Sequence, residues 1–330
     1  MATWVYPPIP PDQLKIKEEE SLAKEVQWLL ESLQDSLALL KEGLEECVAL
    51  LAPKEPGSTL VLSSLRSESV KGFVTRVGTK IVKGDINLRL SSLAPNVPRG
   101  TTTYPSTRYS LAPSTPNSSA PDLTLTPLLN LANHLNSSLD LIDITRWTGQ
   151  STSAPFISGQ LRLLCEHLSS AKACLKGPSP VSPDEPEEEK WWLSSVPPST
   201  FEPALNPNLS LHFSVHDASL VLTVRTLSLA SNPQTPNIHT PSGATEFSLS
   251  SFNLRDRLFG LAGHHKQPTH DEMGESFLWR GKEEVNVREK VRVESADPSL
   301  MSVAAKLSAL EHEVKRWRFN LGVVIGEEDD

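Results

Sequence analysis

A heptad repeat of apolar residues near the C-terminal end of the chain constrains the fold more than any other feature. Between residues 297 and 325, apolar side chains recur at alternating steps of three and four, which aligns them in one stripe on an α-helix. Asp297 suits the N-cap, Pro298 suits the first helical position, and Gly326 suits the end of the helix. Burial of each such side chain contributes ~1.5–3 kcal/mol, so this helix needs an apolar partner. The stripe consists of Leu300, Val303, Leu307, Leu310, Val314, Trp317, Leu321 and Val324.

A second long amphipathic helix is predicted at the other end of the chain, over residues 18–51. Its apolar residues form two adjacent columns, so the stripe is wider than the seam of a two-stranded coiled coil and fits the inner side of a bundle. We therefore predict that the two chain ends pack side by side as helices. The first column contains Val26, Leu33, Leu40 and Cys47, and the second contains Leu30, Leu37, Leu44 and Leu51.

The middle of the chain predicts two further helices, between residues 126 and 176, and several antiparallel strands. The simplest packing gathers the helices into one bundle and the strands into one sheet. The predicted fold class is α+β: an antiparallel helical bundle built from both chain ends and two central helices, plus a separate antiparallel β-domain. Period-two runs predict the strands at residues 59–65, 70–77, 85–90, 209–215, 220–224 and 284–293.

The predicted domains are discontinuous in sequence. The bundle comprises residues 18–51, 126–176 and 297–325, and the β-domain comprises residues 58–93 and 196–294. Runs rich in proline, serine or charge predict mobile loops and tails between and beyond these segments. These loops and tails are residues 1–17, 94–122, 177–190, 231–245, 262–275 and 326–330.

Composition argues against several classes of protein. A net charge of −9 opposes sequence-independent binding to DNA or RNA. The apolar runs fall short of the ~18 residues that span a bilayer, and the N-terminal residues lack the pattern of a secretory signal. Cys47, Cys165 and Cys174 form no disulfide framework and no CxxC pair, so we expect reduced thiols and a cytoplasmic protein.

The residues that could carry chemistry form no established motif. The sequence contains neither a glycine-rich phosphate loop nor a GxSxG elbow, and we expect His212 and His216 to be solvated on the polar face of a hairpin. One further cluster has the composition of a metal site, but its Gly- and Pro-flanked position favours an exposed polar loop. We therefore predict no catalytic residue, metal or cofactor. The cluster consists of His264, His265, His270, Asp271 and Glu272.

Two alternatives stay open at the level of sequence. The heptads fit either an intramolecular bundle, which the presence of four amphipathic helices favours, or a leucine-zipper dimer through residues 300–324. Trp191 and Trp192 stand beside an acidic linker. They either anchor a partner protein, because interface hot spots favour Trp, or pack on the predicted sheet.

Three sequence blocks carry a resemblance to a known family. The blocks are EEESLAKEVQWLLESLQDSLALLKEGLEE (18–46), VKGFVTRVGTKIVKGDINLRL (70–90) and FEPALNPNLSLHFSVHDASLVLTVRTLS (201–228). They are similar to the first helix, the following strand block and a later hairpin of the Rogdi family of leucine-zipper-domain proteins. The longer proline-rich loops depart from the compact animal sequences and look like those of a fungal-type member.

The resemblance implies a non-enzymatic subunit of the RAVE complex, the regulator of the vacuolar and endosomal proton-pumping ATPase (V-ATPase). The implied role is to promote assembly and reassembly of the pump, and hence organelle acidification. The implied partners are a large β-propeller scaffold, a Skp-type adaptor and the soluble sector of the V-ATPase, with peripheral attachment to vacuolar or endosomal membranes. The alternative is a leucine-zipper-type homodimeric regulator unrelated to the pump.

Overall fold

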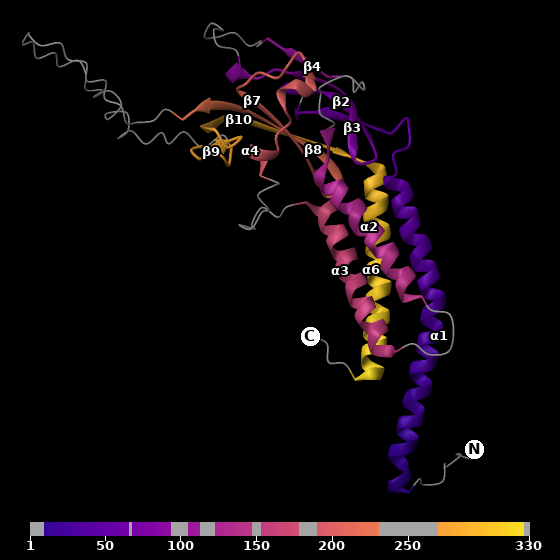
Figure 1. Ribbon diagram of the computed structural model, residues 1–330. Coiled ribbons are helices and arrows are strands. Elements are labelled where there is room, and N and C mark those ends of the chain that lie inside the picture. Colours follow the sequence, from indigo (N-terminus) through magenta and orange to yellow (C-terminus); the bar gives the residue numbers. More distant parts are fainter. Residues whose placement is uncertain are drawn as a thin grey trace, which may run out of the picture.

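Long helices and two antiparallel sheets make up the computed structural model, which describes residues 10–65, 68–93, 105–112, 123–146, 153–177, 190–230 and 270–326. The predicted α+β class is confirmed. In Figure 1 the long helices extend from one end of the molecule, and the sheets lie at the other. Within the described residues, no helix is both long enough and apolar enough to cross a membrane. The helices are α1 (Pro11–Leu51), α2 (Thr126–Thr145), α3 (Ala154–Lys176), α4 (Trp191–Ser194) and α6 (Pro298–Ile325).

The ends of α6 follow the predicted capping pattern. The Asp297 carboxylate accepts hydrogen bonds from the backbone N–H groups of Ser299 and Leu300, and Pro298 occupies the first turn. Gly326 ends the helix with a left-handed φ of 70°. Both ends of α6 therefore lie where the sequence predicted them, at Asp297 and Gly326.

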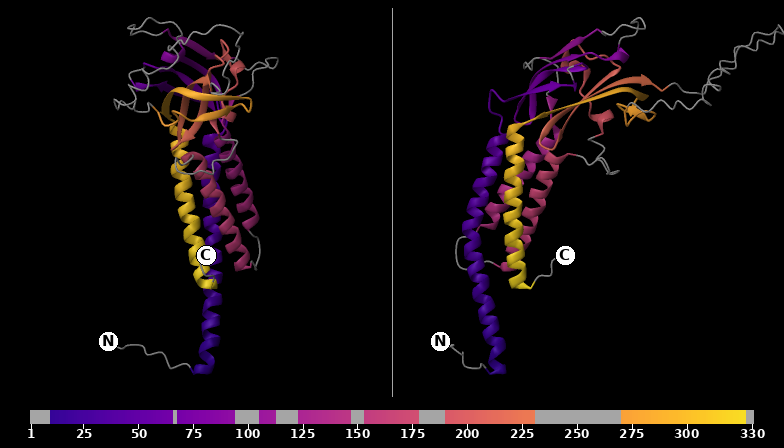
Figure 2. Two further views of the ribbon diagram at one scale, coloured as in Figure 1. Left: turned by 90° about the vertical axis from the view of Figure 1, so that its left-hand side faces the viewer. Right: turned by 180° about the vertical axis from the view of Figure 1, so that it is seen from behind.

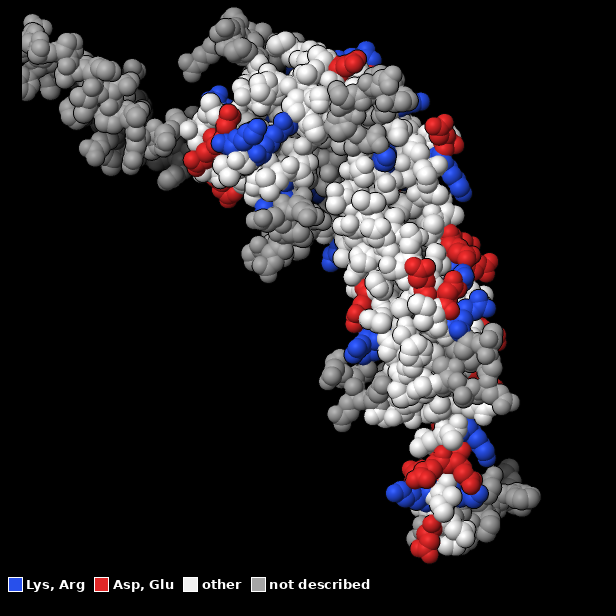
Figure 3. All heavy atoms as spheres, viewed as in Figure 1, with Lys and Arg blue, Asp and Glu red and all other residues white. Residues whose placement is uncertain are grey.

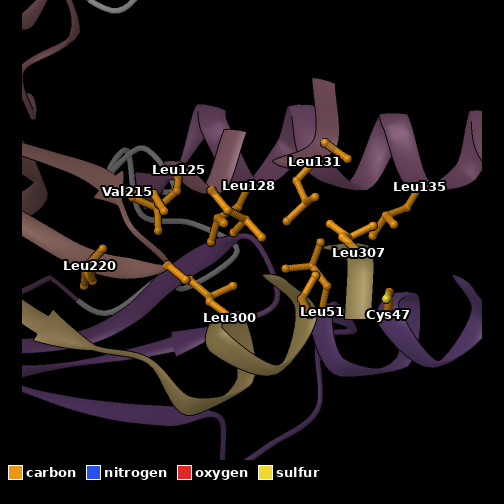
Figure 4. Packing of buried hydrophobic residues seen from close by; sticks show 14 of the residues in the cluster. Cys47, Leu51, Leu125, Leu128, Leu131, Leu135, Val215, Leu220, Leu300 and Leu307 are labelled. Carbon is orange, nitrogen blue, oxygen red and sulfur yellow. The ribbon is translucent and has the colours of Figure 1, made fainter. Parts of the chain in front are cut away.

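The four long helices α1, α2, α3 and α6 pack side by side and are called the stalk below. α6 contacts α1 and α3, and α2 contacts α1 and α3. Leu33 of α1 and Leu310 of α6 belong to the same apolar core, so segments from the two ends of the chain share one interior. Figure 4 shows Cys47 and Leu51 of α1 lying near Leu131 and Leu135 of α2 and near Leu307 of α6.

The strands form two sheets, so the expectation of a single sheet was wrong. The first sheet has the order β1-β2-β3-β4-β6, with β5 paired to β3, and the second has the order β7-β8-β10-β9. The β7–β8 hairpin turns through Asp217 and Ala218, both at positive φ, as a two-residue hairpin turn requires. The first sheet contains β1 (Ser58–Ser63), β2 (Val70–Val77), β3 (Lys80–Leu88), β4 (Thr107–Leu111), β5 (Leu123–Thr124) and β6 (Phe201–Glu202). The second contains β7 (Leu209–His216), β8 (Ser219–Leu229), β9 (Ser276–Trp279) and β10 (Glu283–Ala296).

Two segments expected to be mobile are regular structure. α1 begins at Pro11 rather than at residue 18, because proline is accommodated at the first position of a helix. β4 forms inside the predicted loop 94–122, where Tyr109 is buried and the strand pairs with β3. Pro105 and Pro113 flank this strand rather than interrupt it. The predicted loop 231–245 lies outside the described residues, as does most of the predicted linker 177–190.

A buried ion pair joins the stalk to the first sheet. Arg76 of β2 donates from Nε to Oδ2 of Asp297 at 2.6 Å, and the two side chains are 2% and 0% exposed. Burial alone would raise the pKa of Asp297, but the hydrogen bonds from Arg76 and Ser299 outweigh burial and lower it. The N-terminus of α6 is therefore fixed against β2 by a paired and hydrogen-bonded charge.

Candidate functional site

The predicted helix seam lies inside the stalk. Val26 and Leu310 are half-buried, and the other predicted seam residues are buried. The surface that a leucine-zipper dimer would use is therefore already packed within the chain. The buried seam residues are Leu33, Leu40, Leu300, Val303, Leu307, Val314, Trp317 and Leu321.

Trp191 and Trp192, the predicted partner anchors, lie against the second sheet. The short helix α4 places the Trp191 ring 5.0 Å from Phe277 and 5.9 Å from Trp279, measured between ring centroids. The Arg225 guanidinium lies 4.3 Å from the centroid of Trp191, a cation–π contact. Trp191 is buried and Trp192 is half-buried, so the first is part of a small second core and the second forms its edge.

Two carboxylates of the metal-like cluster are engaged in ion pairs with β8 and β10. Glu272 accepts from Arg225 Nε at 2.7 Å and Nη2 at 2.6 Å, and Lys290 Nζ lies 2.7 Å from Glu272 and 2.8 Å from Asp271. Burial would raise the pKa of Glu272, but the hydrogen bonds from Arg225 and Lys290 lower it overall. These groups attach the turn that contains them to the sheet.

The histidines of the cluster do not complete a metal site in the described part of the chain. His264 and His265 lie outside the described residues, and both ring nitrogens of His270 are buried without a hydrogen-bond partner. Among the residues that the structure describes, no group of three or more His, Cys, Asp or Glu side chains is arranged to hold a metal ion.

His212 is not solvated, contrary to the expectation from the strand pattern. It is half-buried on β7, and burial, together with the charge of Arg225, lowers its pKa to about 4, although Glu272 acts in the opposite direction. The sequence pattern suggested a solvated strand face, but His212 lies close enough to Arg225 and Glu272 to feel their charges. His216 lies with Nδ1 3.4 Å from an Asp217 carboxylate oxygen at the hairpin turn.

A cleft of about 460 Å³ opens where the end of β8 approaches the segment after β3. It is lined by Ser92, Asn206, Asn208, Thr226, Ser228 and Arg288 together with leucines. A β-bulge between Val287 and Glu289 leaves Arg288 without a cross-strand partner. The described lining contains no carboxylate, imidazole or thiol, so it offers hydrogen bonds and one positive charge rather than an acid or base.

A segment with exposed apolar side chains at the start of α1 was missed in the sequence. Figures 1 and 2 show that α1 extends beyond the ends of α2, α3 and α6, and residues 12–28 of this segment are called the α1 overhang below. Leu14 and Ile16 are each 56% exposed, Leu22 is 42% exposed and Trp28 is 63% exposed. The exposure follows from the lengths of the helices in the structure, because α1 has 41 residues and α6 has 28.

Charged side chains gather on the α1 overhang, as Figure 3 shows at the free end of the stalk. Lys17 and Glu20 form an exposed ion pair at 2.9 Å. Residues 12–25 are exposed without exception, and Val26 is the first half-buried position. Another exposed apolar feature is the cross-strand pair Val61 and Phe73 of the first sheet.

The chain matches a known protein family. A family model described as Rogdi leucine zipper containing protein matches residues 25–322. The match begins within α1 and ends within α6, so it includes both sheets and the stalk except for the first part of α1 and the last residues of α6. Comparison with curated proteins found no match.

Proposed function

Because this chain belongs to the Rogdi leucine zipper family, we propose that it is a non-enzymatic subunit of the RAVE complex. In this role it promotes assembly and reassembly of the V-ATPase, and hence the acidification of vacuoles and endosomes. The observation that carries the proposal is the length of the family match, which runs from residue 25 to residue 322.

The geometry supports an adaptor rather than an enzyme. Two residues of the cluster with metal-like composition have a structural role instead. Glu272 and Asp271 form ion pairs with basic residues of the second sheet. We propose that α1, α2, α3 and α6 form an antiparallel bundle that acts as a stiff stalk, with the sheets at one end and a free helix end at the other. Such a shape separates binding surfaces instead of enclosing a substrate.

The proposed partners are other proteins of the same assembly. They are a large β-propeller scaffold, a Skp-type adaptor and, directly or through these two, the soluble sector of the V-ATPase. The protein would act in the cytoplasm and reach vacuolar or endosomal membranes through its partners. The net charge of −9 supports a role without nucleic acid.

Affinity purification and a deletion strain together test the proposal. The tagged full-length protein should recover the propeller scaffold and the Skp-type adaptor, and its deletion should raise vacuolar pH and leave the soluble sector detached from the membrane. Restoration of acidification by the His270→Ala variant, as well as by the wild type, would support a role without catalysis by that cluster. Failure to recover the scaffold, combined with normal acidification in the deletion strain, would refute the proposal.

The alternative of a leucine-zipper homodimer requires a free seam on α6. Leu307 and Val314 of that seam are fully buried against the chain's own helices. Sedimentation at micromolar concentration separates the two ideas, since a stable dimer dissociated by substitutions on α6 would favour the zipper.

A further inference from the structure

The α1 overhang carries an apolar stripe that continues the buried seam of α1. Leu22, Val26, Leu29 and Leu33 follow one another at steps of four, three and four, so they lie on one side of the helix. Leu33 is 1% exposed and Leu29 is 7% exposed, whereas Leu22 is 42% exposed. The stripe therefore continues beyond the ends of α2, α3 and α6, and there no other described residue covers it.

Carboxylates border this uncovered stripe. Since an α-helix has 3.6 residues per turn, Glu18 and Glu25 lie on one side of the Leu22–Val26 line, and Glu19, seven residues before Val26, continues the Val26–Leu33–Leu40 column. Lys17 and Lys24 lie on the opposite face of the helix, and Lys15 stands at the N-terminal end of the stripe. The arrangement is that of a coiled-coil seam with carboxylates on one flank and, at Glu19, in the seam itself.

A second copy of this chain is a poor occupant for the stripe. In a parallel pair equivalent seam positions face each other, so Glu19 of one copy would meet Glu19 of the other. In an antiparallel pair each flank faces its own equivalent, which again opposes carboxylates to carboxylates. Like charges at such positions disfavour association, so both orientations are opposed by the same residues.

A helix of another protein fits the stripe better. Residues 12–25 are exposed in the described structure, so a partner that covers Leu22 would stabilise the overhang by burying apolar surface. Basic residues beside the apolar stripe of the partner would meet Glu18, Glu19 and Glu25.

We propose that the α1 overhang is a docking site for a helix of a partner protein whose apolar stripe is flanked by Lys or Arg. The inference rests on the proposed adaptor role, to which it adds the position and the chemistry of one contact. It is recognition between two amphipathic helices, in which Leu22 and Val26 supply the apolar anchors and the three carboxylates select the partner by charge.

Two designed peptides test the charge rule with the full-length protein. Each has about three heptads with Leu at the seam positions, and they differ only in carrying Lys or Glu at the flanking positions. Fluorescence anisotropy of the labelled peptides should show binding of the Lys peptide and an affinity lower by at least about tenfold for the Glu peptide. The difference should shrink when the salt concentration is raised from about 50 to about 500 mM.

Variants of the overhang locate the binding. Leu22→Asp with Val26→Asp should abolish binding of the Lys peptide, and Trp28→Asp, an exposed apolar residue on another face of α1, should leave it unchanged. Glu18→Lys with Glu19→Lys and Glu25→Lys should reverse the preference, so that the Glu peptide binds more tightly. Because a gain of binding cannot arise from misfolding, this reversal keeps the test decisive.

The outcomes separate this inference from the proposed function. Equal binding of both peptides, or binding that survives Leu22→Asp with Val26→Asp, overturns the docking site even if the scaffold is recovered in the purification. Concentration-dependent dimerisation that the same double variant removes would assign the stripe to a second copy and also overturn the inference. Charge-selective peptide binding without scaffold recovery would retain the site and refute only the RAVE assignment.

Discussion

The two halves of α1 carry the same kind of apolar stripe in different surroundings. In the C-terminal half, Leu37 and Leu44 are buried against the neighbouring helices of the stalk. In the N-terminal half, Leu22 is exposed in the described structure. Periodicity in the sequence shows which side of a helix is apolar, whereas the lengths of the neighbouring helices determine where that side is covered.

The point where the coverage ends follows from the neighbouring helices. α6 and α2 have 28 and 20 residues, so neither can follow the 41 residues of α1 to its N-terminus. The part of the apolar stripe beyond that point either has no binding role or contacts another molecule. Substitutions matched between the two halves distinguish internal packing from an external role.

The largest effect is expected where α6 is fixed beside the packed half of α1. Arg76→Ala leaves the Asp297 carboxylate buried and unpaired, which should lower the free energy of unfolding by about 3–5 kcal/mol. Urea denaturation followed by circular dichroism measures the change. Lys41→Ala is the control, because its partner Asp143 is largely exposed and such pairs contribute about 0–1 kcal/mol. A similarly small loss of unfolding free energy in both variants would show that the ion pair between Arg76 and Asp297 does not stabilise the protein.

Two leucines of α1, one covered by neighbouring helices and one in the overhang, test whether coverage determines how much each stabilises the fold. Leu37→Ala should destabilise the protein by about 2–5 kcal/mol, since the side chain is fully buried and leaves a cavity. Leu22→Ala changes an exposed side chain on the same helix and should stay within about 0.5 kcal/mol. Equal losses for the two variants would mean that the overhang is packed against the rest of the chain in solution.

Much of the stalk could be predicted from the sequence because its determinants are local. The heptads of α6, the cap at Asp297 and the stop at Gly326 are set by neighbouring residues and need no tertiary information. The same holds for the β7–β8 hairpin, since the predicted strands 209–215 and 220–224 lie within β7 and β8 and the turn between them falls at Asp217 and Ala218.

The features that were missed depend on contacts between segments far apart in the chain. The sequence pattern gave His212 a polar, exposed position, and the nearby charges of Arg225 and Glu272 come from β8 and from a distant turn. The partition of the strands into two sheets also has no local signal, because an edge strand and a central strand share the period-two pattern. The candidate interaction surface was missed for a similar reason, since exposure of Leu22 depends on where α6 ends.

A glycine at the contact between α1 and α6 gives a smaller test of the same comparison. A Cβ atom at Gly43 would lie 2.8 Å from Cδ2 of Leu310, so the two helices approach closely at this point. Gly43→Leu should therefore overpack the contact and destabilise the protein by about 1–3 kcal/mol, measured by urea denaturation. Ala23→Leu is the control in the bare half, where the side chain is exposed and the change should be close to neutral. A neutral Gly43→Leu variant would indicate looser packing of α6 on α1.

The smallest effect is expected from charge, and it depends on pH. Glu311 of α6 is 7% exposed and lies 2.5 Å from Lys172 Nζ and 2.7 Å from Lys315 Nζ. Burial would raise the pKa of Glu311, but the hydrogen bonds from the two lysines outweigh burial and lower it. A carboxylate with a lowered pKa stabilises the fold above the ordinary Glu value of about 4.3, and this contribution is lost as pH falls through the lowered pKa.

Glu311→Gln should accordingly destabilise the protein by about 1 kcal/mol at neutral pH, and its difference from the wild type should shrink below about pH 4. Urea denaturation at a series of pH values measures this convergence. Glu20→Gln is the matched change on the overhang, where the hydrogen bond from Lys17 also lowers the pKa but the pair is exposed to solvent. Its stability should follow that of the wild type at every pH. If Glu20→Gln instead reproduced the pH dependence of Glu311→Gln, the α1 overhang would have to be packed against other residues as tightly as the C-terminal half of α1.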